Sequence, residues 1–291
     1  MQSHLDCVPC FLGQALGAAR QVSDDPALHE RILRATLERL HTLDLTTPPP
    51  VLGREIHRLI REATGDPDPY RAAKDASTAL VLRLLPELEA EVAAAADPFD
   101  RAVRLAIAGN IIDLAHATDI DESRLRATLE DCRTRAPAVD HLAALRRAAA
   151  GADQILYLAD NAGEIVLDRL LLAQLRPERT TVAVRGGPVI NDATRADAEA
   201  AGLTGWVAVV DNGADVPGTL LAACAPAFRE RFRAADLIIA KGQGNFETLP
   251  WDDPRIFFLF KVKCPIAARA VGCAEGEIVI CNRPDQEAHA R

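Results

Sequence analysis

The sequence predicts an α/β protein in which a mostly parallel, Rossmann-like sheet of doubly wound type follows an all-helical N-terminal part. Two observations indicate this fold class. Residues 1 to about 150 carry helical patterns only, whereas short runs rich in valine and isoleucine appear from residue 152 onward. Helical stretches or loops separate most of these runs, as expected for a parallel sheet that is covered on both faces.

Helices in the first half have recognisable start and stop signals. The segment Ser23-Asp24-Asp25-Pro26 is typical of a helix start, and three prolines at 48–50 end that helix. A second amphipathic helix runs from residue 51 to a Gly-Asp-Pro turn. We assign the apolar helix that contains LAIAGNIIDLAHA to the sheet, so we expect a helical domain over 1–100 and an α/β domain over 101–291. Longer helical patterns cover residues 70–96, 98–118 and 121–149.

Six apolar runs in the second half predict β-strands. Each run is short and rich in β-branched or aromatic residues, which favour strands. The predicted strands are QILYLA (154–159), TTVAVR (180–185), WVAVVD (206–211), DLIIAK (236–241), IFFLFKV (256–262) and EIVIC (277–281).

The bulk composition excludes several classes of protein. The chain of 291 residues has 42 acidic and 33 basic residues, and its formal net charge of -9 disfavours a nucleic-acid partner. No apolar run is long enough to cross a bilayer, and no basic-then-apolar leader begins the sequence, so we expect a cytoplasmic protein without a membrane partner. The seven cysteines are scattered and are expected to be reduced thiols.

Polar side chains follow each of the first five predicted strands. Because ligands of open α/β sheets bind at the carboxyl ends of the strands, this convergence predicts a site at that edge. The strands are followed in turn by Asp160-Asn161, by Gly186-Gly187-Pro188 and Asn191-Asp192, by Asp211-Asn212-Gly213, by the segment from Lys241 to Glu247, and by Lys263-Cys264.

Three of these residues have the chemistry of metal ligands. Asp160, Asn161 and Asp192 offer oxygen ligands from two neighbouring strand ends, and hard cations such as Mg²⁺ and Mn²⁺ prefer oxygen ligands. The alternative is that these residues cap helices, because Asp and Asn both accept hydrogen bonds from the free N–H groups of a helix start. Spacing alone leaves both interpretations open.

The segment KGQGNFE resembles a dinucleotide-binding loop only superficially. Glu247 stands where the third glycine of that fingerprint is needed, and the fingerprint belongs early in the fold. A turn whose glycine N–H groups approach an anion, with Lys241 supplying a positive charge, fits the segment better. The alternative is a loop with a solvated lysine.

Cysteines and a polar helix segment supply further candidates. Cys7 and Cys10 form a C-x-x-C pair, which is a weak zinc signal without a second pair. We expect both thiols to meet Cys264 in space, either binding an ion or packing together. Asn110 and Asp113 place two polar groups inside an apolar helix, where they either brace the helical part or reach the site. No pair of histidines has metal-ligand spacing, which argues against a zinc hydrolase.

Seven motifs taken together resemble the damage-control phosphatase family, long catalogued as a domain of unknown function. The resemblance covers essentially the whole chain in order, and the CxxC, GNFE and KC elements look like the stand-alone prokaryotic branch of the family. It implies a three-layer α/β/α sandwich preceded by a helical domain, and a divalent-metal-dependent phosphatase of small phosphorylated metabolites. The motifs are CVPC, AGNIID, LADNAGEIVLD, RGGPVINDATRADA, DNGADVPGT, KGQGNFETL and KVKCP.

By this similarity the metal ligands fall on Asp160, Asn161 and Asp192, and the phosphate-binding lysine falls on Lys241. We expect one divalent ion, Mn²⁺ or Mg²⁺, with Co²⁺ or Ni²⁺ as alternatives. The residues expected to contact the substrate are Lys241, Gly242, Asn245, Glu247, Asn110 and Asp211.

The expected reaction is hydrolysis of a phosphomonoester, either a sugar phosphate or a phosphate related to damaged nucleotides or cofactors. Glu164 or Asp211 is the candidate general base, and Asp160 as a nucleophile is the alternative. Two other functions remain open: an S-adenosylmethionine-dependent carboxyl methyltransferase, and a non-catalytic protein that binds sugar phosphates with a metal. The oligomeric state is not specified by the sequence.

Overall fold

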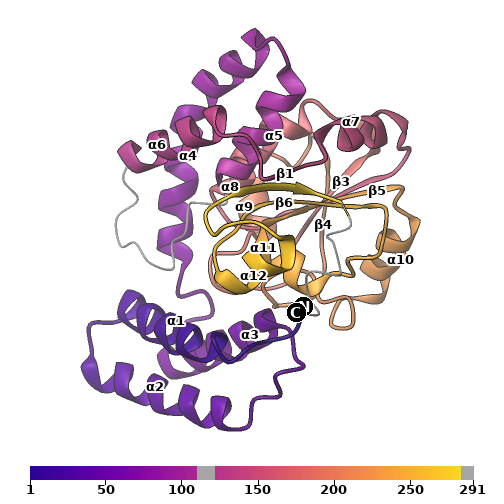
Figure 1. Cartoon of the computed structure of the whole chain (residues 1–291). Coiled ribbons are helices and arrows are strands. Elements are labelled where there is room, and N and C mark those ends of the chain that lie inside the picture. Colours follow the sequence, from indigo (N-terminus) through magenta and orange to yellow (C-terminus); the bar gives the residue numbers. More distant parts are fainter. Residues whose placement is uncertain (110–121, 283–291) are drawn as a thin grey trace.

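The computed structural model describes residues 1–109 and 122–282, and within them the chain forms a seven-stranded sheet with helices on both faces (Figure 1). The strand order is β1-β7-β6-β5-β2-β3-β4, and neighbours pair in parallel except for the antiparallel pair of β6 and β7. The predicted α/β class with a mostly parallel sheet is therefore confirmed. The strands are β1 (Val139–Asp140), β2 (Ile155–Leu158), β3 (Thr180–Val184), β4 (Ala208–Asp211), β5 (Leu237–Lys241), β6 (Ile256–Lys261) and β7 (Ile278–Cys281).

All six predicted strands are present, and β1 is an additional one. The expectation of an unbroken helical pattern over 121–149 is wrong, because a two-residue strand interrupts it. Pro137 follows the helix that ends at Thr134, and proline cannot continue a helix. Val139 then pairs with Val279 of β7, so β1 depends on a partner distant in the sequence.

Two hydrophobic clusters lie on opposite faces of the sheet, because side chains alternate along each strand. In β2, Ile155 and Tyr157 belong to one cluster, whereas Leu156 and Leu158 belong to the other. The first face is covered by α4 (Arg71–Ala94), α5 (Pro98–Ala108), α6 (Glu122–Thr134), α7 (Leu142–Gly151), α8 (Glu164–Leu172) and α9 (Arg195–Ala200). The second face is covered by α10 (Pro226–Ala234), α11 (Gly242–Thr248) and α12 (Pro265–Val271). A short 3₁₀ helix, η2 (Pro177–Arg179), precedes β3.

The first three helices share a separate hydrophobic cluster. They are α1 (Cys7–Val22), α2 (Pro26–His41) and α3 (Pro49–Thr64), and they lie below the sheet in Figure 1. Their cluster includes Phe11, Ile32, Ile56 and Tyr70. Helix α4, in contrast, contributes to the cluster on the sheet. The boundary at residue 100 stays a prediction, while the packing groups α4 and α5 with the sheet.

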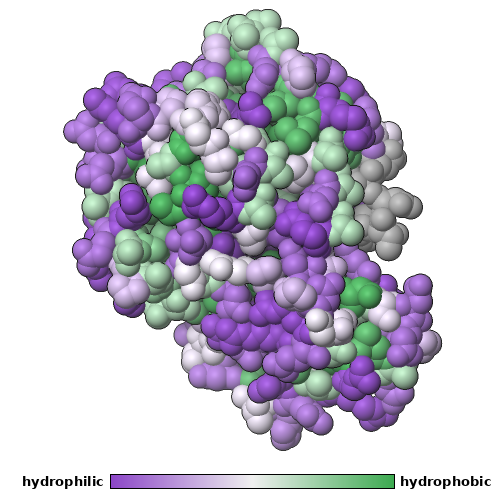
Figure 2. All heavy atoms as spheres, turned by 180° about the vertical axis from the view of Figure 1, so that it is seen from behind, coloured by the Kyte–Doolittle hydropathy of each residue, from purple (hydrophilic) through white to green (hydrophobic). Residues whose placement is uncertain are grey.

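The face seen in Figure 2 is mostly hydrophilic, and its hydrophobic areas are small and interrupted by polar residues. Within the described ranges, none of the helices combines the length and the hydropathy needed to span a membrane.

Candidate functional site

The carboxyl ends of β2 and β3 bring the predicted metal ligands together. Asp160 and Asn161 follow β2, and Asp192 follows β3 after a loop. The Ala193 N–H donates to the carbonyl oxygen of Asp160 over 2.7 Å, and an isolated antiparallel bridge pairs Asn161 with Asp192. The three residues, distant in the sequence, are therefore neighbours at one edge of the sheet.

The side chains at this edge are buried and connected by polar contacts. Nδ2 of Asn161 donates to Oδ2 of Asp160 over 2.7 Å and to Oε2 of Glu164 over 3.0 Å. Nε of Arg185 donates to Oδ2 of Asp192 over 2.6 Å, and Nη2 of Arg185 lies 3.7 Å from Oδ1 of Asp160. Arg185 ends the predicted strand 180–185, and its place at a strand end is the signal that could have identified it as a site residue.

Carboxylates crowd one another in the site. Burial and the charges of Glu164 and Asp192 raise the pKa of Asp160 well above its ordinary value. Lys263 and Arg185 act in the opposite direction without cancelling that rise. Buried carboxylates with too little positive charge around them are unfavourable, so a cation bound here would be stabilising.

The set of ligands at this edge fits a hard divalent cation. Asp160, Asn161 and Asp192 present carboxylate and carboxamide oxygens, which Mg²⁺ and Mn²⁺ prefer. Within residues 1–109 and 122–282, no group of three or more His, Cys, Asp or Glu side chains is arranged to hold a metal ion. One of the three candidate ligands is an asparagine, and Asp192 is turned toward Arg185. The metal-ligand assignment stays a prediction.

Gly242, at the start of α11, packs directly against Asp160. Its φ of 79° lies in the left-handed region, and a Cβ atom at this position would lie 2.0 Å from Oδ2 of Asp160. Only glycine satisfies both conditions. The turn after β5 therefore forms one wall of the site. Of the other predicted contacts, Asn110 lies outside the described residues, as does Asp113.

The Lys241 side chain points into the interior of the protein, and its expected contact with a phosphate stays a prediction. Its side chain is fully buried, and Nζ donates to the carbonyl oxygen of Ala106, to Oε1 of Glu164 and to Oδ1 of Asp168 at 2.9, 2.8 and 2.6 Å. An ammonium group has three hydrogens to donate, and all three are used. Although burial opposes its charge, Asp168 and Glu164 raise the pKa of Lys241. Lys241 therefore fixes two carboxylates behind the site.

The amide of Asn245 and the carboxylate of Asp211 have structural partners. Nδ2 of Asn245 donates to the Lys241 carbonyl over 2.7 Å, and its Oδ1 accepts from the Thr219 hydroxyl over 2.7 Å. Asn245 thus joins α11 to the loop before α10. Asp211 is exposed at the end of β4, where its carboxylate accepts from the Gly213 N–H. Both residues stabilise loops at the sheet edge.

Glu247 lies on α11, and Lys263 lies in the loop between β6 and α12. Burial raises the pKa of Glu247 to about 7, although Gln243 and Lys263 lower it. Lys263 is exposed, and its charge also lowers the pKa of Asp160, so it is close to both carboxylates. Lys263 directly follows the predicted strand 256–262, and this position is the signal in the sequence that points to it.

The expectation that Cys7, Cys10 and Cys264 meet in space is confirmed. Burial raises the pKa of Cys10, and the nearby Cys264 and Cys7 thiols raise it further. Nε2 of Gln243 donates to Sγ of Cys264 over 3.4 Å, which connects these thiols to α11. Because none of the described groups of His, Cys, Asp or Glu side chains is arranged to hold a metal ion, the structure favours packing as the role of these thiols.

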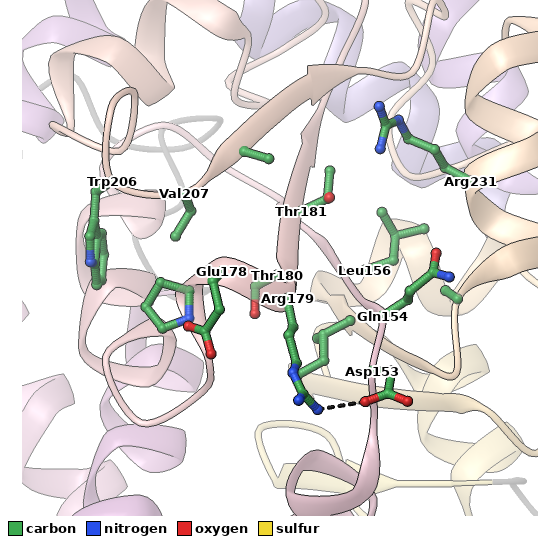
Figure 3. A pocket seen from close by; sticks show the side chains of 14 residues that line it. Asp153, Gln154, Leu156, Glu178, Arg179, Thr180, Thr181, Trp206, Val207 and Arg231 are labelled. Carbon is green, nitrogen blue, oxygen red and sulfur yellow. Dashed lines mark hydrogen bonds and ion pairs between the residues drawn. The ribbon is translucent and has the colours of Figure 1, made fainter.

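A hollow of about 350 Å³ lies at the opposite end of the strands from Asp160 (Figure 3). Its lining includes Ile155 and Thr180, the first residues of β2 and β3, together with Trp206. Arg179 points toward Asp153 there and is paired with it at 2.6 Å. This hollow is at the amino ends of the strands and is separate from the residues around Asp160.

Known proteins resemble this chain over nearly its whole length. Residues 3–279 match the family described as the damage-control phosphatase ARMT1-like domain. A damage-control phosphatase of Pyrococcus horikoshii is 31% identical over 284 residues, covering 96% of this chain and 97% of that protein. An uncharacterized protein of Methanocaldococcus jannaschii is 31% identical over 291 residues, covering 96% and 94% respectively. A crystal structure of a DUF89 family protein from P. horikoshii has a TM-score of 0.88 at 30% identity, covering 97% of this chain and 99% of that chain.

Proposed function

The chain belongs to the ARMT1-like damage-control phosphatase family, and from that premise we propose that it is a divalent-metal-dependent phosphatase. Its proposed substrates are small phosphomonoesters, either sugar phosphates or phosphates related to damaged nucleotides and cofactors. The proposed ion is Mn²⁺ or Mg²⁺, with Co²⁺ or Ni²⁺ as alternatives. Asp160, Asn161 and Asp192 are its proposed ligands.

The observation that carries this proposal is the cluster of buried carboxylates at the ends of β2 and β3. The charges of Glu164 and Asp192 raise the pKa of the buried Asp160, which indicates too little positive charge around it, and Asn161 adds a neutral oxygen ligand. A bound divalent ion supplies Lewis-acid chemistry here by neutralising phosphoryl charge. In this proposal Glu164 orients Asn161, and Lys241 in turn holds Glu164.

In this proposal, Arg185 and Lys263 are better placed than Lys241 to bind the phosphate of the substrate. Nη2 of Arg185 is buried without a hydrogen-bond partner in the described part of the chain, and it faces Asp160. A guanidinium can hold two phosphoryl oxygens at once. Lys263 adds an exposed positive charge near Asp160. Because positioning and charge stabilisation dominate phosphoryl transfer, these two cations are well suited to it.

The test is phosphate release from a panel of sugar phosphates and nucleotides by metal-stripped protein. Mg²⁺, Mn²⁺, Co²⁺ and Ni²⁺ are each added separately. We expect turnover with at least one ion, and loss of about 100-fold or more in Asp160→Asn, because the ion and its ligands supply several kcal/mol of charge stabilisation. Asp153→Asn, at the other end of β2 and largely exposed, is the matched control and should keep full activity.

Other outcomes decide against the proposal. Tight binding of a sugar phosphate without any phosphate release would identify a binding protein. Methyl transfer from S-adenosylmethionine to a carboxyl group without added metal would identify the methyltransferase. Full activity of Asp160→Asn would refute the assignment of the site.

A further inference from the structure

The loop that delivers Asp192 contains an unusual backbone conformation. Ile190 has a φ of 44°, and it is the one non-glycine residue with a positive φ in the part of the chain that the structure describes. A β-branched side chain disfavours this left-handed region strongly. Ile190 precedes Asn191, whose carbonyl accepts from the Ala162 N–H over 2.8 Å. The strained turn therefore sets how the Asp192 segment meets the Asn161 segment.

A histidine from α3 holds this turn. Nε2 of His57 accepts a hydrogen bond from the Ile190 N–H over 3.1 Å. The imidazole is 3% exposed, and its ring centroid lies 5.0 Å from that of the buried Tyr70. Because Nε2 accepts, the ring proton is on Nδ1, and Nδ1 is buried without a hydrogen-bond partner among the described residues. A buried polar atom without a hydrogen-bond partner calls for an explanation. Here the ring orientation that lets Nε2 accept from Ile190 leaves Nδ1 without a partner.

Other residues of α3 contact the same region. Arg61 donates to the carbonyl oxygen of Pro188, and it forms an ion pair with Asp215 at 2.8 Å. A Cβ atom on Gly53 would lie 3.5 Å from Pro217 and 4.0 Å from Ile190, so the helix backbone itself packs closely here. Helix α3 thus contacts two loops, the one after β3 and the one after β4.

We propose that His57 is a positioning residue of the phosphatase site: it fixes the Ile190 turn and thereby places Asp192 beside Asn161. The inference rests on the proposed function, since it takes Asp192 to be a metal ligand. His57 does not touch the ligands themselves. It acts through the backbone, and it makes the geometry of the metal site depend on the helices α1–α3.

The experiment measures Mn²⁺ binding by calorimetry in the full-length protein, with kcat and KM alongside. His57→Leu removes the acceptor and keeps an apolar side chain, and we expect Mn²⁺ affinity to fall about 10- to 100-fold, as for outer-shell partners of metal ligands. His57→Gln can offer its Oε1 to the Ile190 N–H and should restore most of the affinity. Excess Mn²⁺ should recover most of the kcat of His57→Leu while leaving KM for the phosphoester nearly unchanged.

A matched control separates this role from general stability. Thr36→Val removes a buried hydroxyl of α2 whose hydrogen bond goes to the Ile32 carbonyl, within the same helical cluster. It should lower the melting temperature without changing Mn²⁺ affinity. If His57→Leu does not fold, His57→Asn is the second variant, because its side chain stays polar but is too short to reach the Ile190 N–H.

The outcomes are distinct. Unchanged Mn²⁺ affinity in folded His57→Leu, or in His57→Asn where that variant is used, overturns the positioning role while the proposed function stands. Absence of Mn²⁺ and Mg²⁺ binding in the wild-type protein overturns the proposed function, and with it this inference. Weakened binding in His57→Leu with rescue by His57→Gln supports both.

Discussion

Several buried side chains hold the residues of the proposed metal site in place without reaching the site themselves. Lys241 is buried at the end of β5, where Asp168 and Glu164 accept from its ammonium group. Tyr157 also donates to Oδ1 of Asp168 over 2.7 Å. These residues form a charged cluster behind Asn161, in which Lys241 is the cation that both carboxylates contact.

Lys241→Met should therefore lower the free energy of unfolding by about 3–5 kcal/mol, because two buried carboxylates lose their cation. The measurement is equilibrium unfolding in urea at neutral pH. Lys261→Met is the control, since its partner Asp131 is 3.6 Å away and the pair is partly exposed. That change should stay within about 1 kcal/mol. Equal losses in the two variants would contradict the buried-cluster interpretation.

The lowered pKa of His57 should make the free energy of unfolding depend on pH. Burial lowers its pKa to about 3, with Arg61 and Lys74 adding to the effect and Asp215 opposing it. The unfolded histidine, with an ordinary pKa of 6.5, binds a proton at a pH where the folded one does not. The stability that depends on a neutral His57 is fully present above pH 6.5. It is lost as the pH falls toward 3, by up to about 1.4 kcal/mol per pH unit.

Urea unfolding of wild type and His57→Gln at pH 7, 6 and 5 checks this sign. The free energy of unfolding should fall more steeply with decreasing pH in the wild type, because only the wild type must protonate this residue on unfolding. Parallel pH profiles for the two proteins would show that His57 is charged, or accessible to water, in the folded state.

At the scale of elements, the site depends on how β5 turns into α11. The turn needs a left-handed residue at 242, and the same residue must leave room for the Asp160 carboxylate. The loop before α10 approaches from the other side, where the Gly218 N–H faces Oδ2 of Asp192 at 3.4 Å. Short, closely packed turns therefore shape the site more than long side chains do.

Two glycines allow the requirement for a left-handed φ to be tested separately from the requirement for space beside Asp160. Gly242 and Gly272 both have a φ of 79°, but a Cβ atom on Gly272 would meet nothing within 4 Å. Gly272→Ala should cost only the strain of the left-handed conformation, about 1–2 kcal/mol. Gly242→Ala should cost more and should also abolish metal-dependent phosphate release, because it displaces Asp160. Thermal unfolding and activity assays measure both effects, and equal behaviour of the two variants would refute the argument.

At the scale of the whole molecule, local patterns predicted the sheet well and the site only in part. The six strands were visible because each is an apolar run bounded by turn residues. β1 was not, because a two-residue strand has no periodicity and exists through its pairing with Val279. The sequence points to Asp160 and Asp192 because Asp160 follows β2 and Asp192 lies in the loop after β3.

Lys241 shows why the remaining part of the site was not predicted. The sequence placed Lys241 correctly at a strand end, but its partners Glu164 and Asp168 lie on α8, and Ala106 lies on α5. Which way a lysine points depends on such tertiary partners. The same holds for His57, whose contact with Ile190 joins residues far apart in the sequence.

The sheet topology also has a consequence for folding during synthesis. Among the described residues, β1 pairs with β7, which is the last of the described strands, and β7 in turn pairs with β6. While the ribosome is still translating the segment before β7, β2, β3 and β5 can already assemble, but β1 waits without a partner. Because non-local pairing is slow, completion of that edge should come last, after the C-terminal strands leave the exit tunnel.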